Sequence, residues 1–403
     1  MNSQKRLRIA FFCYYDPLDK RSWSGIPFYL GKTLQKHVGD VDFLGPVKTP
    51  WVLDKFLRGV AKFTRIVFHK EYITKYSILL NIHATWFLKR RMKGKQYDFI
   101  IAPASAPQLG LLNTKMPVVY FSDSTYRNYS SNYKKEFKNL SGFSRWEGEY
   151  LEKRALQKSS LIIMASEWAR ESAIKDYNVP AELTEINLFG ANMDFIPPAD
   201  GIFEKEKNPI LTLLFVAVDW ERKGGPLAFD ALIALREMGI NAQLIICGCQ
   251  PPPEFSDSNM RVIPFLDKNR PNDHEVFVAL LSSCHFLILP TRADCSLIVA
   301  CEANSYGVPA ITTSVGGVAE VVINDVNGYC LPLEAQGKEY AKQIAAIYTD
   351  REKYHELIAS SRKRFEEVLN WDKWAEKFLE FYNKRLTKDQ LKEKLPTVAD
   401  IRQ

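Results

Sequence analysis

Two carboxyl groups, those of Asp294 and Glu302, stand eight residues apart just after an apolar run of strand length. A helix that begins near Ser296 would leave Asp294 in the loop before it and carry Glu302 two turns along. Both carboxylates would then face one ligand that extends across the helix N-terminus. Carboxylates accept hydrogen bonds from neighbouring hydroxyl groups, in which sugars and ribose are rich. The spacing therefore predicts a site for a polyhydroxyl ligand.

A basic pair, Arg222 and Lys223, follows the apolar run 211–218 and precedes Gly224 and Gly225. Arginine can bind phosphate oxygens through two parallel hydrogen bonds, and lysine adds a mobile point charge. Because glycine has no Cβ, the backbone here can approach a ligand closely. A diphosphate suits this combination, and a solvated basic turn is the alternative interpretation.

Glycoside hydrolysis is the competing chemistry for Asp294 and Glu302, because glycosidases also use a pair of acids. Both acids would then have to flank one bond, and the basic pair and its glycines would have no role. We therefore rank hydrolysis below the binding of a nucleotide and a sugar. Gly25 adds a weaker signal, since a small residue before the helix expected at 26–37 lets backbone N–H groups receive a phosphate. An ordinary strand-to-helix turn is its alternative.

Short apolar runs alternate with helical segments along the chain, as expected of parallel sheets whose strands are buried on both faces. The sequence therefore predicts two doubly wound α/β domains. Strands are expected at 7–15, 97–103, 117–122, 160–166, 211–218, 242–248, 285–290 and 308–313. Helices are expected at 26–37, 147–157, 167–177, 225–238, 273–283 and 297–306.

The pair Pro197-Pro198, Gly201 and a charged stretch interrupt this alternation. We expect the linker near 197–209, an N-terminal domain at 1–197 and a C-terminal domain at 198–370. From Gly337 the chain reads as three helices, of which the last spans 371–386. We expect the segment 371–403 to form a C-terminal helix and tail that returns to the N-terminal domain, with the charged part after Thr387 frayed.

The composition is that of a folded protein, with 403 residues of which 46% are hydrophobic and 25% charged. No run reaches the eighteen or so apolar residues that a membrane span needs. The first residues predict a strand and lack the features of a signal peptide. The seven cysteines show no zinc-ligand spacing, and Cys247 and Cys249 suit a strand end better than a metal site. We expect reduced thiols and a cytoplasmic protein.

Positive charge is concentrated between residues 51 and 100, which carry 11 basic and 3 acidic side chains. Within 54–70, Lys55, Arg58, Lys62 and Arg65 recur on one face of a helix, and aromatic and β-branched residues recur on another. A second basic cluster follows at 88–95. Such a helix either lies on anionic lipid or packs its apolar face on the core with a solvated basic face. No nucleic-acid-binding module accompanies the charge.

The segment from Pro290 to Val322 resembles the E-x7-E region of the retaining enzymes of glycosyltransferase family 4, and VAVDWERKGG resembles their phosphate-binding motif. The resemblance covers nearly the whole chain in order, through SGIPFYLGKTL, PVVYFSDSTY, SEWARESAIKDYNV, LFGANMDFIP and WDKWAEKF. It implies the GT-B fold, two Rossmann-like domains that face each other across a cleft. It also implies transfer of a sugar from a nucleotide donor, with retention of configuration and without a bound metal or other cofactor.

The resemblance also implies the role of each site residue. Arg222 and Lys223 would hold the donor diphosphate and stabilise the charge on the leaving group. Glu302 would bind the ribose hydroxyls and Asp294 a hydroxyl of the donor sugar. Backbone N–H groups of Cys295, Ser296 and Leu297 would lie near the phosphate and sugar, and Gly25 would stand in the loop of the N-terminal domain that closes on the phosphates.

The chain departs from the family pattern at two positions. Asp294 replaces a glutamate that is longer by one methylene, so a water bridge, a shifted pose or another donor sugar would have to compensate. Many enzymes of the family carry a histidine at the strand end Tyr120–Asp123, where this chain has none. Asp123, beside Ser122, is our candidate for the polar residue next to the reacting centre; it could equally cap the turn. Phe265 and Leu266 lie at a strand end that suits backbone recognition of the base.

The leading hypothesis is a retaining glycosyltransferase that acts on a glycan, a lipid-linked molecule or a small molecule. The alternatives are a nucleotide-sugar epimerase or hydrolase on the same scaffold, and a non-catalytic protein that binds a nucleotide sugar or a partner. A fold alone cannot decide between them. The basic segment 54–70 adds the expectation of peripheral contact with an anionic membrane, at its cytoplasmic face.

Overall fold

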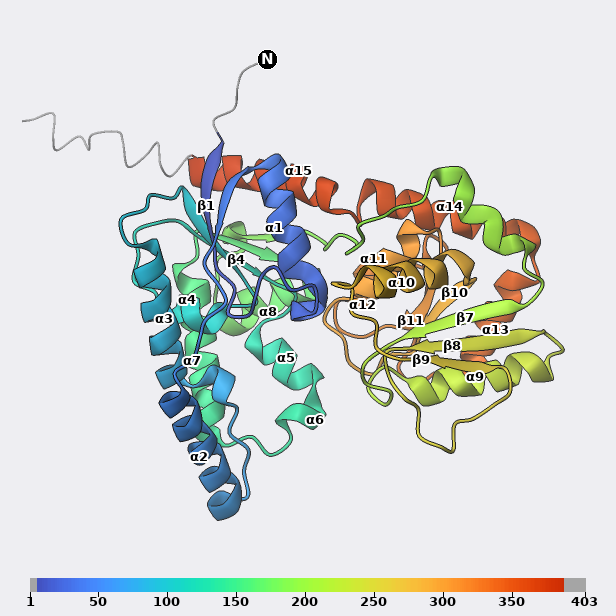
Figure 1. Ribbon diagram of the computed structural model, residues 1–403, viewed down its shortest axis with the longest axis horizontal. Helices are drawn as coiled ribbons and strands as arrows, with labels where there is room; N and C mark the ends of the chain where they lie inside the picture. The colour runs from blue at the N-terminus through green and yellow to red at the C-terminus, as the bar shows by residue number, and fades with distance from the viewer. Residues whose placement is uncertain (1–5, 388–403) are drawn as a thin grey trace, which may run out of the picture. The chain divides into compact units, whose positions relative to one another are not determined.

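The computed structural model describes residues 6–387 and divides into two compact units (Figure 1). Unit 1 consists of Pro27–Asn187 together with the chain up to Ser22 and from Trp374 onward. Unit 2 consists of Leu188–Lys373 and the short segment Trp23–Ile26. Each unit is built around one parallel sheet of six strands.

The sheet of unit 1 has the strand order β2-β1-β3-β4-β5-β6 and is parallel throughout. Ile9 of β1 lies between Val41 of β2 and Phe99 of β3. Every residue of β3, β4 and β5 is buried, so helices and loops cover both faces of this sheet. The strands are β1 Leu7–Phe11, β2 Gly39–Phe43, β3 Phe99–Pro103, β4 Val118–Ser122, β5 Leu161–Met164 and β6 Thr184–Ile186.

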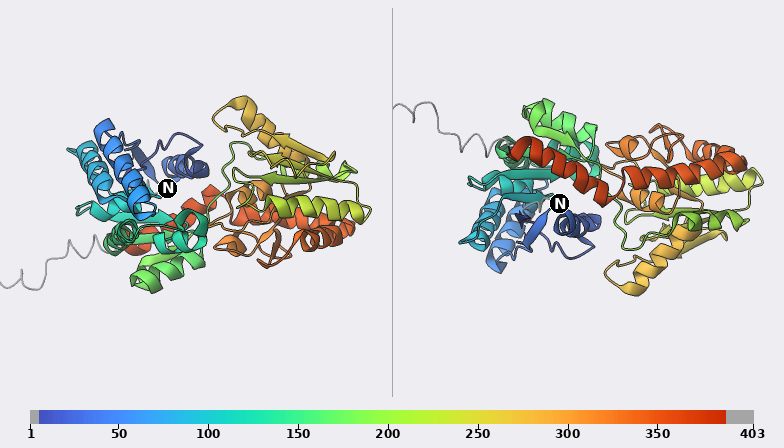
Figure 2. Two further views of the ribbon diagram at one scale, coloured as in Figure 1. Left: turned by 90° about the horizontal axis from the view of Figure 1, so that it is seen from below. Right: turned by 90° about the horizontal axis from the view of Figure 1, so that it is seen from above.

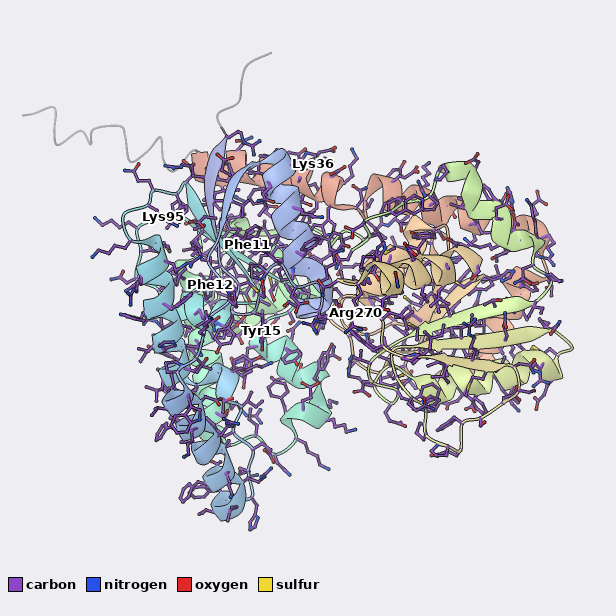
Figure 3. The ribbon with its side chains drawn as sticks, in the orientation of Figure 1. Phe11, Phe12, Tyr15, Lys36, Lys95 and Arg270 are labelled. Atoms are coloured by element: carbon purple, nitrogen blue, oxygen red, sulfur yellow. The ribbon has the colours of Figure 1, made fainter. Side chains whose placement is uncertain are left out.

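Two consecutive aromatic residues at the end of β1 are part of the buried interior of unit 1. Phe11 ends β1, and both it and the next residue, Phe12, are completely buried (Figure 3). The helices are α1 Ile26–His37, α2 Trp51–Phe68, α3 Ile78–Met92, α4 Ala106–Leu111, α5 Tyr126–Asn132, α6 Lys134–Phe137, α7 Gly142–Lys158 and α8 Glu167–Tyr177.

The sheet of unit 2 is also parallel, with the order β12-β11-β10-β7-β8-β9. Its first strand, β7, pairs with β8 on one side and with β10 on the other. The direction in which strands are added therefore reverses between β7 and β10, and ligands bind at such a switch point in open α/β sheets. The strands are β7 Leu211–Val216, β8 Ala242–Cys247, β9 Met260–Ile263, β10 Phe286–Leu289, β11 Ala310–Thr313 and β12 Gly328–Leu331.

The helices of unit 2 are followed by a final helix, α15 Trp371–Tyr382, which contributes to the core of unit 1. The ring of Trp374 lies 5.6 Å from that of Phe121, and the ring of Phe378 lies 5.7 Å from that of Phe99. The helices of unit 2 are α9 Gly225–Glu237, α10 Pro271–Ser283, α11 Ile298–Ser305, α12 Val318–Val321, α13 Gly337–Tyr348 and α14 Arg351–Glu367.

The prediction of two doubly wound α/β domains is confirmed, and helices occur in all the regions where the sequence predicted them. The compact units divide at Asn187–Leu188 and at Lys373–Trp374, whereas the predicted domains end at 197 and 370. The pair Pro197-Pro198 lies inside unit 2, just before the 3-10 helix Ala199–Lys207. The tail after Thr387 lies outside the described residues.

Candidate functional site

The loops that follow β7 and β10 meet at the switch point of unit 2. Gly224 lies immediately before α9 with φ of 78°, and a Cβ added there would lie 2.0 Å from the carbonyl oxygen of Pro290. The backbone N–H of Arg292 donates to the carbonyl oxygen of Arg222 at 2.8 Å. Only glycine satisfies both the left-handed backbone and this close approach. Gly224 therefore brings the loop of the basic pair against the loop of Asp294.

The guanidinium group of Arg222 spans these two loops. Its Nη1 donates to the carbonyl oxygen of Ala293 at 2.9 Å, and its Nε lies 3.6 Å from Oδ2 of Asp219. Oδ1 of Asp219 accepts a hydrogen bond from the backbone N–H of Arg222 at 3.0 Å. The side chain of Arg222 is 22% exposed, so it is held in position while part of it reaches solvent. This is a suitable arrangement for binding an anionic group.

Lys223, the second member of the basic pair, forms an ion pair with Asp294. Its Nζ donates to Oδ2 of Asp294, and the two side chains are only 15% and 8% exposed. The structure thus brings together a cation predicted to hold phosphate and a carboxylate predicted to bind sugar. Their proximity places the two predicted functions in one small region.

Glu302 lies on α11 and is paired with Lys268, a residue that sequence analysis missed. Nζ of Lys268 lies 2.6 Å from Oε1 of Glu302 and 4.4 Å from the ring centre of Phe277. Burial raises the pKa of Glu302, and the ammonium of Lys268 opposes this effect. Lys268 follows β9 by five residues, in the same strand-end segment as Phe265 and Leu266. Its position at the carboxyl end of a strand was the signal that could have identified it.

The segment Cys295–Leu297 leads directly into α11, which begins at Ile298 rather than near Ser296 as expected. Two of its carbonyl groups accept hydrogen bonds from neighbouring backbone. The carbonyl of Cys295 accepts from the N–H of Gly317 at 3.2 Å, and that of Leu297 accepts from the N–H of Ala300 at 3.0 Å. The predicted backbone donors therefore lie in a fixed turn at the start of the helix that carries Glu302.

The turn before α1 has an unusual backbone that includes Gly25. Trp23, Ser24 and Gly25 have φ values of 43°, 57° and 88°, and the first two are in a region that residues with a Cβ rarely adopt. The carbonyl of Ser24 accepts from Nδ2 of Asn192 at 2.8 Å, and the ring of Trp23 lies 5.6 Å from that of Phe189. Backbone strain of this kind is often found at binding sites.

Asp123 lies in unit 1, directly after β4. Oγ of Ser124 donates to Oδ1 of Asp123 at 3.4 Å, and Oγ of Ser122 donates to the carbonyl of Ser124 at 2.8 Å. The N-cap of α5 is Thr125, whose Oγ1 accepts from the N–H of Asn128 at 3.2 Å. Asp123 is therefore not the residue that caps this helix.

The structure gathers most of the predicted site residues in unit 2, and Asp123 belongs to unit 1. In the described chain, residues 6–387, no group of three His, Cys, Asp or Glu side chains could hold a metal ion. Within the same range no helix combines the length and apolar character needed to cross a bilayer. The residues gathered in unit 2 are Gly25, Arg222, Lys223, Asp294, Cys295, Ser296, Leu297 and Glu302.

Residues 200–364, which include the basic pair and both carboxylates, match the family model described as glycosyl transferases group 1. YtcC of Bacillus subtilis, whose name marks its glycosyltransferase activity as unproven, is 25% identical over 58% of this chain and 63% of its own length. The MMP alpha-(1->4)-mannosyltransferase of Mycolicibacterium hassiacum is 22% identical over 60% of this chain and 59% of its own. The chain thus spans less than two thirds of the length of these relatives.

Solved structures with the same fold cover almost the whole chain. Sucrose-phosphate synthase from Thermosynechococcus elongatus has a TM-score of 0.68 and 17% identity, over 94% of this chain and 99% of its own. HepE of Anabaena in complex with UDP has a TM-score of 0.64 and 14% identity, over 94% and 100%. WaaG, a glycosyltransferase involved in lipopolysaccharide biosynthesis, has a TM-score of 0.60 and 17% identity, over 92% and 98%. The fold is therefore GT-B.

Proposed function

We propose that this protein is a retaining glycosyltransferase that transfers a sugar from a nucleotide-sugar donor without a bound metal ion. The observation that carries the proposal is the site at the switch point of unit 2, where Arg222 and Lys223 meet Asp294. This site lies within the segment that matches the glycosyl transferases group 1 model. HepE has been crystallised with UDP and with UDP-glucose, so UDP-glucose is the first donor to test.

In the proposed reaction the bond between the anomeric carbon and the diphosphate breaks, and an acceptor hydroxyl forms the new bond on the same face of the sugar. The hydroxyl loses its proton to the departing diphosphate. Arg222 and Lys223 bind the diphosphate oxygens and stabilise the charge that develops on them. This electrostatic term supplies most of the rate enhancement in the proposal, because it acts in a partly buried site where water screens charge poorly.

Donor binding gives both buried carboxylates new hydrogen-bond donors in this proposal. A diphosphate competes with Asp294 for Lys223, and Asp294 then accepts hydrogen bonds from the donor sugar. Ribose hydroxyls bind Glu302, whose charge Lys268 continues to balance. Gly25 and the N–H groups of Cys295–Leu297 contact the phosphates and the sugar.

The acceptor is a glycan, a lipid-linked molecule or a small molecule, and Asp123 is the proposed polar residue beside the reacting centre. Asp123 would orient the sugar or stabilise positive charge at the anomeric carbon. We also propose a cytoplasmic protein in peripheral contact with anionic membrane through residues 54–70. These assignments are tested separately from the donor site.

The decisive experiment incubates the protein with UDP-, GDP-, ADP- and dTDP-sugars, with and without a membrane extract, and follows nucleotide release. Transfer predicts release that the extract accelerates, and an NMR spectrum of the product with the anomeric configuration of the donor. A rate of nucleotide release that is the same with and without the extract would favour a hydrolase or an epimerase. Binding of nucleotide without any release would favour a non-catalytic protein, and neither outcome is compatible with the proposal.

A further inference from the structure

Only one residue of α2, Leu57, is fully buried, although the helix has 18 residues. In Figure 1 the C-terminal half of α2 extends beyond the sheet of unit 1, and Figure 2 shows the helix at the edge of this unit. A helix attached by so small a contact leaves most of its circumference to solvent. The side chains on the exposed faces of α2 therefore determine what this helix can bind.

One exposed face of α2 is apolar. Successive residues of a helix are about 100° apart, so Val52, Phe56 and Phe63 fall on one side of it. Ile66 and Val67 continue this side, and the exposures of all five lie between 51% and 69%. We call these five residues the apolar face of α2. One of the two interpretations of the sequence was that the apolar side of this helix packs on the core. In the structure the apolar face is exposed and points away from the core.

A basic face borders the apolar face, about a third of a turn away. Lys55, Arg58, Lys62 and Arg65 lie on it, and all four are exposed. Nζ of Lys55 lies 4.9 Å from the ring centre of Trp51, which is itself 67% exposed. Cations beside an exposed apolar stripe complement the anionic headgroups and the acyl chains of a phospholipid surface.

A row of stacked aromatic rings begins four residues after α2 ends. The ring centre of Phe143 lies 6.3 Å from that of Tyr72 and 5.8 Å from that of Trp146, and the rings of both pairs are stacked. Phe143 and Trp146 are more than half exposed. Amphipathic aromatic rings concentrate at the boundary between water and lipid. The aromatic row is thus a second exposed feature suited to a bilayer surface.

We propose that α2 lies in the plane of an anionic phospholipid bilayer, with its apolar face inserted and its basic face on the headgroups. Leu57 anchors the helix to unit 1, and Phe143 and Trp146 contact the headgroup boundary. The membrane then presents a lipid-linked acceptor to unit 1. This last step rests on the proposed function; the docking itself does not.

A second copy of the chain fits this surface less well than lipid. If two copies paired their apolar faces about a two-fold axis, the four cations of one copy would approach the four cations of the other, and like charges would repel. Lysine is also depleted at protein interfaces, whereas basic residues beside apolar ones are typical of helices that lie on membranes. Charge complementarity therefore favours the bilayer.

The test is sedimentation of the full-length protein with vesicles of phosphatidylcholine alone or with about one third phosphatidylglycerol. We expect binding to the anionic vesicles that weakens with salt, because the Debye length falls from about 10 Å at 0.1 M to about 3 Å at 1 M. Lys55→Gln/Lys62→Gln should lower partitioning about 25-fold, since each basic residue near such a surface contributes about fivefold. The matched control Lys342→Gln/Lys363→Gln, on unit 2, should bind like the wild type.

Phe56→Ser/Phe63→Ser tests insertion, with Met238→Ser as the exposed apolar control on unit 2. We expect the first variant to lose binding at least tenfold and the control to keep it, with unchanged circular dichroism in both. Brominated lipids should quench part of the tryptophan fluorescence, and Trp146→Phe should remove some of that quenching.

Equal binding of the wild type to neutral and anionic vesicles would overturn the proposal. The proposal would also be overturned if the wild type formed a dimer and bound no vesicles, and if the substitutions Phe56→Ser/Phe63→Ser dissociated that dimer. Nucleotide release from a soluble donor provides the independent readout. If nucleotide release persists without vesicle binding, the docking proposal is wrong and the glycosyltransferase proposal stands. If the protein binds vesicles but turns over no donor, the docking proposal stands and the glycosyltransferase proposal is wrong.

Discussion

Lys268 and Glu302 form an ion pair in which Nζ lies 2.6 Å from Oε1, and only 17% and 4% of the two side chains are exposed. The pair joins the loop after β9 to α11, which begins beside Asp294. A buried carboxylate that already has a cationic partner can receive ribose hydroxyls without first being ionised or desolvated. The pair therefore prepares Glu302 for the role that the proposal gives it.

Glu302→Ala should weaken nucleotide binding by about 1.5–3 kcal/mol, the usual loss for hydrogen bonds to a charged acceptor. Isothermal titration calorimetry with UDP, GDP, ADP and dTDP measures this change. Glu356→Ala, at an exposed position of α14, is the matched control and should bind like the wild type. Unchanged affinity of Glu302→Ala for every nucleotide would remove this residue from the ribose site.

Replacing Lys268 separates the structural role of the pair from its binding role. Lys268→Met should destabilise unit 2 by about 3–5 kcal/mol, because it leaves a buried carboxylate without its partner. Lys268→Met/Glu302→Gln should recover most of that loss, and chemical denaturation measures both. If the single variant is as stable as the wild type, the pair contributes nothing to the fold.

Arg222→Ala and Lys223→Ala should each lower turnover by a factor of about 10²–10³, because each removes a cation aimed at the leaving diphosphate. Lys223 also balances the charge of Asp294, so Lys223→Ala/Asp294→Asn controls for the unpaired carboxylate. Arg236→Ala, on the exposed side of α9, should retain full turnover. Near-normal rates in both single variants would contradict the assigned role of the basic pair.

The sequence predicted the bounds of several helices well, because these bounds are set locally. The predicted helix 167–177 coincides with α8, whose N-cap Ser166 and left-handed C-cap Asn178 are adjacent in sequence to the helix they terminate. The strands β2, β6 and β12 were missed, and β9 was indicated only by the strand end at Phe265 and Leu266; all four strands lie at edges of the sheets. They are short, and some of them lack the continuous apolar run that marks a strand buried on both faces.

Contacts between distant residues account for what the sequence could not supply. Lys268 and Glu302 are 34 residues apart, and nothing local marks one as the partner of the other. Similarly, the period of α2 predicts a helix with an apolar side, but only tertiary packing decides that Leu57 is buried and Phe63 is not. The left-handed backbone at Trp23 and Ser24 is likewise invisible in residue types that normally avoid it.

Turnover should persist in excess EDTA, because Arg222 and Lys223 neutralise the leaving group in the proposed mechanism and no divalent ion is needed for that task. The rate of nucleotide release is measured before and after chelation, and again after Mg²⁺ or Mn²⁺ is added back. An activity that disappears with EDTA and returns with either ion would be incompatible with this mechanism.

Gly224→Ala should be far more costly than Gly239→Ala, although the two glycines have nearly equal φ values of 78° and 80°. A Cβ on Gly239 would meet no atom within 4 Å, so that variant bears only the strain of a left-handed alanine, about 1–2 kcal/mol. A Cβ on Gly224 would also collide with the carbonyl oxygen of Pro290, which adds about 1–3 kcal/mol. Denaturation and nucleotide titration compare the pair, and equal losses would mean that the loop contact is unimportant.

Glu152 of α7 is a buried carboxyl group behind the strand end that carries Asp123. Oε1 accepts a hydrogen bond from the hydroxyl of Tyr120, which precedes Asp123 by three residues on the same strand end. Burial, helped by the nearby charge of Glu149, raises the pKa of Glu152 from 4.5 to about 7, although the hydrogen bonds from Tyr120 and from the Tyr126 backbone oppose the shift. The folded state therefore holds this proton at pH values where the unfolded chain has released it.

Stability should accordingly fall as pH rises from 4.5 to about 7, the window between the unfolded and folded pKa values of Glu152. Between pH 5 and pH 8 we expect the wild type to lose about 2–3 kcal/mol relative to Glu152→Gln, since one pKa unit corresponds to 1.36 kcal/mol. Urea denaturation of both proteins at the two pH values measures this, and any pH-independent cost of the substitution cancels. The control Glu182→Gln, at an exposed position, should lose as much stability between the two pH values as the wild type does. Parallel pH profiles for wild type and Glu152→Gln would show that this carboxyl group does not titrate in the window.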